Sequence, residues 1–153
     1  MQKVHESGEI VLQTRSAKYG KLHNGLMVQV PAALVRRQQA HIVNVAQVEV
    51  FLILGNNGWI WIGDQPKISG GIQSLNFSQM DVGYTQVDRR KRDNIAYVRS
   101  CVDCLAKCWL EITVDNILKV FATAKELNLE SKDLCSDDVV FRVVQPVIDS
   151  LKE

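Results

Sequence analysis

Hydrophobic residues form two dense runs in the middle of the chain, residues 48–54 and 59–62, separated by the sequence Gly55-Asn56-Asn57-Gly58. β-Branched and aromatic residues dominate both runs, which predicts two β-strands. The Asn57-Gly58 pair predicts a tight antiparallel hairpin, because both central positions of a type I′ turn need positive φ. Apolar residues occupy both faces of the strands near the turn, so we expect both faces to be covered.

Two further strand patterns lie nearer the N-terminus. Val4 and residues 9–14 flank a Ser-Gly turn sequence and predict a short hairpin, which has too few strands to be stable alone. Residues 26–30 predict another strand, which ends at Pro31. Residues 32–39 predict a helix, since Pro31 suits the first turn of a helix.

The second half of the chain changes to the three- and four-residue spacing of amphipathic helices. This spacing predicts a long helix over about residues 87–110, a second over residues 114–121 and a third over residues 139–151. Ser136 is a suitable N-cap for the third helix, and Pro146 is expected to kink it. Strands followed by helices predict an α/β protein of the α+β kind.

The composition is that of a folded chain with little net charge. The sequence has 153 residues, about one domain, of which 46% are hydrophobic and 23% charged, and its formal net charge is +1. No apolar run approaches the roughly 20 residues that a membrane span requires, and the N-terminus lacks the apolar stretch of a secretory signal. We therefore expect a cytosolic or nuclear protein with no membrane partner.

Three of the four cysteines, Cys101, Cys104 and Cys108, fall within the long predicted helix, and Cys135 lies further along the chain. Three thiolates on one flank of a helix could hold a metal ion, but zinc sites usually place paired cysteines on turns, and a fourth ligand is missing. Cysteine also packs as a small apolar residue. The favoured interpretation is therefore reduced, metal-free cysteines that fill the core.

The sequence contains no group with the spacing of a catalytic site. The three histidines, His5, His23 and His41, do not share a helical face, and no arrangement of Cys, His and Asp indicates a nucleophile. We expect neither a cofactor nor a small-molecule substrate. These observations favour a binding protein over an enzyme.

Positive charge is concentrated at two places. Residues 1–40 hold six Lys or Arg against two acids and include the adjacent pair Arg36 and Arg37. Residues 89–92, Arg-Arg-Lys-Arg, open the long helix, where a solvated helix start is favoured over a phosphate-binding or localisation signal.

Gly55 and Gly58 match the Gly-x-x-Gly loop by which KH domains approach nucleic-acid phosphates. That loop joins two helices, whereas residues 55–58 are predicted to join two strands. A hairpin turn is therefore the favoured interpretation of this motif.

Three segments carry a family resemblance: QTRSAKYGKL at residues 13–22, VQVP at residues 28–31 and ILGNNGWIWI at residues 53–62. Together they closely resemble the eukaryotic exosome cap subunits of the ribosomal RNA-processing protein 4 family. Members of that family combine an N-terminal β domain, an S1-type OB barrel and a KH domain. The resemblance implies a truncated S1-type OB remnant, with its β-hairpin and a linker, over residues 1–25. It implies a KH-type domain, with a small antiparallel or mixed sheet packed on helices and with C-terminal helices, over residues 26–153.

The resemblance implies a non-catalytic role. Cap subunits bind RNA and contact the other cap and ring subunits of the RNA exosome. They help guide RNA to a 3′–5′ exonuclease, for rRNA processing and RNA degradation in the nucleus, nucleolus and cytoplasm. The alternative that stays open is an autonomous KH-type RNA-binding regulator outside the exosome.

The resemblance also guides the choice of site residues. Archaeal relatives carry a glycine loop after the motif that matches residues 28–31, and its absence here implies that the usual KH phosphate clamp is lost. The family's Gly-x-Asn-Gly signature falls on the turn at residues 55–58, for which we expect a structural role. Modest RNA contact is expected at five basic residues: Arg15, Lys18, Lys21, Arg36 and Arg37.

Overall fold

The computed structural model describes residues 3–4, 10–11, 22, 24–64 and 86–152. The chain divides into two compact units, one made of residues 24–65 and 87–153 and the other of residues 1–23 and 66–86. In the second of these, β1 (Lys3–Val4) pairs antiparallel with β2 (Ile10–Val11), as expected for a hairpin near the N-terminus. Residues 12–14 of its predicted second arm lie outside the described residues.

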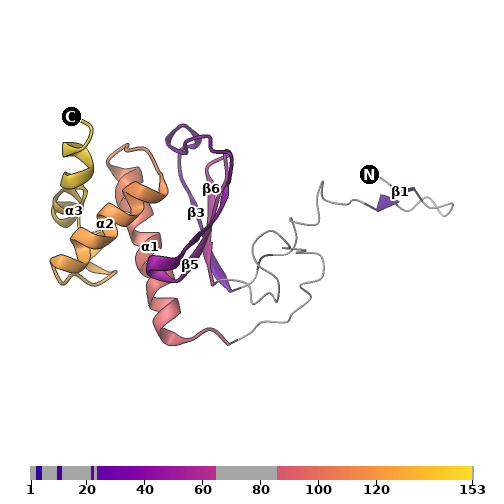
Figure 1. Ribbon diagram of the computed structural model, residues 1–153, viewed down its shortest axis with the longest axis horizontal. Coiled ribbons are helices and arrows are strands. Elements are labelled where there is room, and N and C mark those ends of the chain that lie inside the picture. Colours follow the sequence, from indigo (N-terminus) through magenta and orange to yellow (C-terminus); the bar gives the residue numbers. More distant parts are fainter. Residues whose placement is uncertain (1–2, 5–9, 12–21, 23, 65–85, 153) are drawn as a thin grey trace. The chain divides into compact units, whose positions relative to one another are not determined.

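The larger unit contains a four-stranded sheet (Figure 1). Its strands are β3 (Gly25–Gln29), β4 (Ile42–Val45), β5 (Val50–Leu54) and β6 (Trp59–Gly63), in the order β3-β6-β5-β4. Every neighbouring pair is antiparallel, and the central strands β5 and β6 form the predicted hairpin. Strand β4 was not predicted, because a four-residue edge strand gains its order from pairing with β5 rather than from a pattern of its own.

Three helices confirm the three helical patterns: α1 (Arg89–Lys107), α2 (Val114–Glu126) and α3 (Asp137–Asp149). Helix α1 packs against the sheet, α2 packs against α1, and α3 packs mainly against α2 (Figure 1). Thr113 begins α2 by accepting a hydrogen bond from the Asn116 amide at 3.2 Å. Ser136 precedes α3 as predicted, but its side chain makes no capping hydrogen bond. No helix in the described part of the chain has the length and apolar character needed to cross a membrane.

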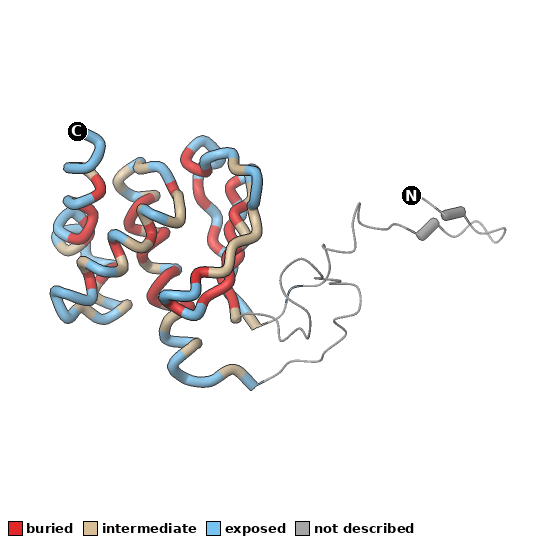
Figure 2. Tube along the Cα trace, in the orientation of Figure 1, coloured by how far each residue is buried: buried red, intermediate tan, exposed pale blue. Residues whose placement is uncertain are grey.

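The core lies where α1 faces the sheet and continues between the three helices (Figure 2). The sheet contributes Val28, Val50, Leu52, Leu54, Ile60 and Ile62, and the helices contribute Val98, Val102, Leu105, Ile117, Val120, Val143, Val144 and Val147. Each of these side chains is buried, which stabilises the fold by roughly 1.5 to 3 kcal/mol per large aliphatic residue. Every second side chain of β5 and β6 thus belongs to this core, and these side chains pack the β5–β6 hairpin on α1.

The other face of the hairpin is also buried near its centre. Phe51 and Trp61 are 1% and 8% exposed, and their rings meet edge to face with centroids 6.1 Å apart. The Trp61 indole lies across the cross-strand partners Gly25 and Gly63, where any Cβ would collide with the ring. The expectation of two covered faces is confirmed there, while Trp59 at the start of β6 is 44% exposed.

The helix predicted over residues 32–39 is wrong beyond a single 3₁₀ turn, Ala32–Leu34. The next residue, Val35, is extended and forms a parallel bridge with Ile112, whose amide donates to the Leu34 carbonyl at 2.8 Å. Leu34 and Val35 are both buried. Pairing with a distant segment therefore outweighs the local helical preference.

The predicted type I′ turn is also wrong in detail. The amide of Gly58 donates to the Gly55 carbonyl at 2.9 Å, and the amide of Gly55 donates to the Trp59 carbonyl at 2.9 Å. Gly58 has a φ of +85°, whereas Asn56 and Asn57 have no positive φ. The connection is a three-residue hairpin loop, in which a turn is followed by one left-handed glycine.

Candidate nucleic-acid interface

The candidate interface lies at the end of the sheet where residues 30–41 run beside the β5–β6 turn. At one end of this loop, the Val30 amide donates to the Gly58 carbonyl at 2.9 Å. At the other end, the Leu54 amide donates to the His41 carbonyl at 2.8 Å, and His41 Nδ1 lies 2.9 Å from the Leu54 carbonyl oxygen. The hairpin therefore holds both ends of the loop at residues 30–41, which carries Arg36 and Arg37.

Gly58 is required at this position for two separate reasons. Its φ of +85° is a conformation that residues with a Cβ rarely adopt. A Cβ at Gly58 would also collide with the Val30 carbonyl oxygen and approach the Ala32 amide nitrogen at 3.1 Å. The glycine thus permits close contact between the turn and the chain that leaves β3.

Three backbone amides at the β5–β6 turn donate hydrogen bonds within the hairpin itself. The Trp59 amide donates to Asn57 Oδ1 at 3.2 Å, and the amides of Gly55 and Gly58 donate to carbonyls within the hairpin. A KH phosphate clamp depends on backbone amides that are free to approach phosphate. The amides of Gly55, Gly58 and Trp59 are already occupied, so the geometry favours a structural turn over a clamp.

Arg36 and Arg37 lie on the exposed part of the loop. Arg36 Nε is 3.8 Å from Glu111 Oε1, and the two side chains are 65% and 47% exposed, so this ion pair is weak. Arg37 has no ion pair or hydrogen bond within the described residues. Two guanidinium groups are therefore available to phosphate at this end of the sheet.

The other three predicted RNA contacts, Arg15, Lys18 and Lys21, lie outside the described residues. Arg36 and Arg37 lie on the loop whose two ends, at Val30 and His41, are bonded to the β5–β6 hairpin. The structure adds two residues that were not singled out for RNA contact. His41 lies against the turn, with Nε2 3.4 Å from Asn56 Nδ2, and Glu111 lies beside Arg36. Glu111 reaches this place through the Val35–Ile112 bridge, a contact that no local pattern indicates.

The cysteines on α1 lie in the core, as predicted. Cys101 and Cys104 are buried, Cys108 is half-buried, and Cys135 is exposed. Burial raises the pKa of the Cys101 and Cys104 thiols, that of Cys104 to about 12, so both are protonated at neutral pH. The Cys104 thiol donates to the Leu134 carbonyl at 3.5 Å. Across the described residues, no group of three or more His, Cys, Asp or Glu side chains is arranged to hold a metal ion.

Sequence comparison assigns a class to this architecture. The KH domain family matches residues 25–67, which span all four strands of the sheet. Together with an antiparallel sheet packed on helices, this match defines an α+β protein with a KH domain.

Curated relatives narrow the class. The Bos taurus exosome complex component RRP4 is 30% identical over 158 aligned residues, which cover 100% of this chain and 50% of the relative. The Mus musculus exosome complex component RRP4 is 32% identical over 149 residues, which cover 94% of this chain and 47% of the relative. The Saccharomyces cerevisiae exosome complex component RRP4 is 42% identical over 62 residues, 40% of this chain and 17% of the relative. The chain is thus similar to RRP4 exosome complex components along nearly its whole length, and it spans about half the length of the first two relatives.

Proposed function

We propose that this chain is a non-catalytic, RNA-binding structural component of the RNA exosome cap. In this role it helps guide RNA to the 3′–5′ exonuclease for rRNA processing and RNA degradation, in the nucleus, the nucleolus and the cytoplasm. The observation that carries the proposal is the similarity to an exosome complex component along the whole chain. The KH match and the two exposed arginines at the end of the sheet support a contact with RNA.

RNA contact in this proposal is modest and relies on side chains rather than on a backbone clamp. Arg36 and Arg37 bind phosphate groups, and Arg15, Lys18 and Lys21 make further contacts with RNA. The Gly55–Gly58 turn supports the loop and has a structural role in this proposal, since the amides of Gly55, Gly58 and Trp59 donate within the hairpin. A small number of phosphate contacts gives weak, salt-dependent and sequence-independent binding.

Docking to other exosome subunits is the main role in this proposal. Residues 26–153 act as the KH-type domain, and residues 1–25 correspond to the end of an S1-type OB domain with its linker. Catalysis is assigned to a separate nuclease of the assembly.

The proposal is tested by mixing the full chain with purified exosome ring subunits and, separately, with single-stranded RNA. We expect a stable complex with the ring and weak RNA binding at physiological salt. Tight, sequence-specific RNA binding by the chain alone, without assembly on the ring, would contradict the proposal and favour an autonomous RNA-binding regulator.

A further inference from the structure

A groove of about 780 Å³ opens between the turn before β5, the first turns of α1 and the C-terminal half of α2. Val48 and Phe121 supply its apolar part, and Arg89, Arg90 and Lys125 supply positive charge. This groove lies near the start of β5, whereas the candidate RNA interface lies at the end of β5. A five-residue strand separates them by roughly 17 Å. The groove is thus a separate surface.

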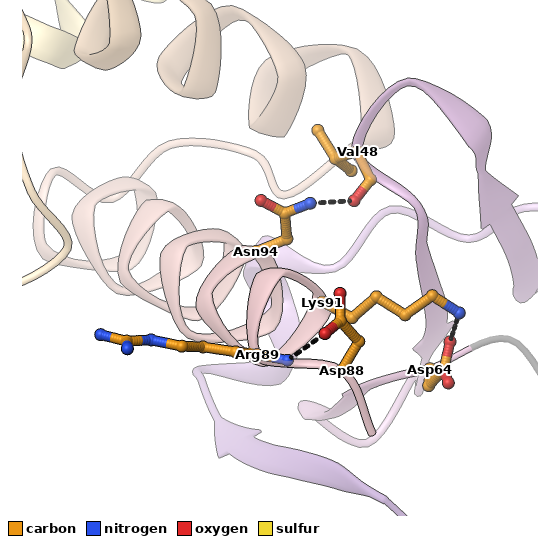
Figure 3. A network of polar contacts seen from close by, with 6 residues as sticks. All are labelled: Val48, Asp64, Asp88, Arg89, Lys91 and Asn94. Atoms are coloured by element: carbon orange, nitrogen blue, oxygen red, sulfur yellow. Dashed lines mark hydrogen bonds and ion pairs between the residues drawn. The ribbon is translucent and has the colours of Figure 1, made fainter. Parts of the chain in front are cut away.

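Two polar contacts, from Asn94 and Lys91, hold the first turns of α1 beside the sheet, and a third caps the start of the helix (Figure 3). Asn94 Nδ2 donates to the Val48 carbonyl at 3.0 Å, and Asp88 accepts from the Arg89 amide at 2.8 Å. Lys91 Nζ lies 2.7 Å from Asp64 Oδ1. Arg89 and Lys91 point away from each other, so the ion pair of Lys91 leaves Arg89 free (Figure 3).

The groove holds three cations, Arg89, Arg90 and Lys125, and none of them forms an ion pair within the described residues. Arg89 and Arg90 are exposed and have no carboxylate partner within the described residues. The Lys125 ammonium lies 4.2 Å from the centroid of the Tyr97 ring and 5.5 Å from that of Phe121, contacts that orient its charge without neutralising it. Two arginines at the start of a helix are unfavourable for the helix dipole, and an anionic partner would relieve this.

We propose that the groove binds an acidic segment of a partner protein. Carboxylates of that segment lie against Arg89, Arg90 and Lys125, and an apolar side chain packs on the half-buried Phe121. The groove also contains Asp88 and Asp93, and Asp93 has no partner within the described residues. The backbone amides of a peptide, polyglutamate included, can donate to Asp93, whereas the phosphates of an RNA backbone carry no donor and are repelled by it. This inference goes beyond the proposed function, since none of these residues takes part in the RNA contact described above.

Fluorescence anisotropy of the full chain with two probes tests the inference: a short fluorescein-labelled polyglutamate peptide and a labelled single-stranded oligouridylate RNA. The test variant is Arg89→Glu/Arg90→Glu, which should fold because acidic residues are favourable at the start of a helix. The matched control is Arg92→Glu/Arg142→Glu, which changes the net charge equally at exposed positions outside the groove.

The expected result is an affinity for polyglutamate about tenfold weaker in the test variant, close to unchanged in the control, with RNA affinity equal in both. Lys125→Gln, on a different helix, should weaken polyglutamate binding in the same direction. The inference is overturned if neither variant affects polyglutamate, or if the control weakens it as much as the test variant. Loss of RNA affinity alone in the test variant would instead identify the groove as a nucleic-acid site.

Discussion

The backbone of Val30 meets the backbone of Gly58 at the end of the sheet. The Val30 amide donates to the Gly58 carbonyl at 2.9 Å, and the Val30 carbonyl oxygen occupies the space that a Cβ on Gly58 would need. Val30 leads into the loop that carries Arg36 and Arg37, and Gly58 belongs to the β5–β6 turn. This one contact therefore joins the two parts of the candidate interface.

Gly58→Asp should lower the free energy of unfolding. Positive φ alone accounts for about 1 to 2 kcal/mol, and the collision with the Val30 carbonyl adds to it. The control is Asn56→Asp, which adds the same charge in the same turn at an exposed residue without positive φ, and should change stability by less than about 0.5 kcal/mol. Urea unfolding measures both effects. Native stability together with impaired RNA binding in Gly58→Asp would mean that the turn is a phosphate clamp.

Arg36→Ala/Arg37→Ala should weaken RNA binding, because it removes the two guanidinium groups that contact phosphate. If both guanidinium groups bind phosphate, the slope of log affinity against log salt should become shallower by about 1.4, the value for two contacts to a single strand. Glu111→Gln offers an opposite control, because removing the acid beside Arg36 should keep or increase RNA affinity. Titrations at several salt concentrations would refute these contacts if the slope of the double variant equalled that of the natural chain.

Stability should fall as the pH rises above about 9. Burial raises the pKa of Cys104 from 9.0 to about 12, raises that of Cys101 in the same direction and raises that of Tyr97 from 10.0 to about 12. The folded chain then holds protons that the unfolded chain has lost, so the contribution is complete below pH 9 and is lost as the pH rises toward the folded pKa values. Each group contributes at most about 1.4 kcal/mol per pH unit.

Urea unfolding at several pH values measures this effect. Cys101→Ala/Cys104→Ala should reduce the pH dependence above pH 9. An equal dependence in the variant and in the natural chain would show that these thiols are not the source.

Thiol modification should follow exposure. Iodoacetamide should react with Cys135 first, with half-buried Cys108 more slowly, and with Cys101 and Cys104 only when the chain unfolds. Mass spectrometry of timed samples measures the order. Fast reaction of Cys104 in the folded chain, or stoichiometric zinc in the purified protein, would contradict protonated thiols packed in the core.

The sequence predicted those helices and strands that have a clear local turn signal or a long periodic apolar pattern. The β5–β6 hairpin and the three helices follow from residue spacing, because one periodic face of each packs into the core. The helix predicted over residues 32–39 failed since Val35 pairs with Ile112, a residue far away in the sequence on the other side of α1. The turn at residues 55–58 differs from the type I′ form because Asn57 accepts from the Trp59 amide and only Gly58 has positive φ.

In the candidate site, too, local sequence features could be predicted and tertiary contacts could not. Arg36 and Arg37 could be selected from sequence as an adjacent basic pair after a strand and a proline, although their segment was predicted to be a helix. Contacts made through tertiary packing could not be selected, and these include Glu111 beside Arg36 and Lys125 beside the start of α1. RNA binding by the arginines stays a prediction, and Arg15, Lys18 and Lys21 stay predictions as well.

Assembly tests the central claim most directly. Native mass spectrometry of the full chain mixed with an exosome ring without its RRP4 cap subunit would measure whether the chain joins the assembly. The account predicts a complex that contains the ring and this chain and that persists without RNA. A chain that binds RNA but never the ring would contradict it.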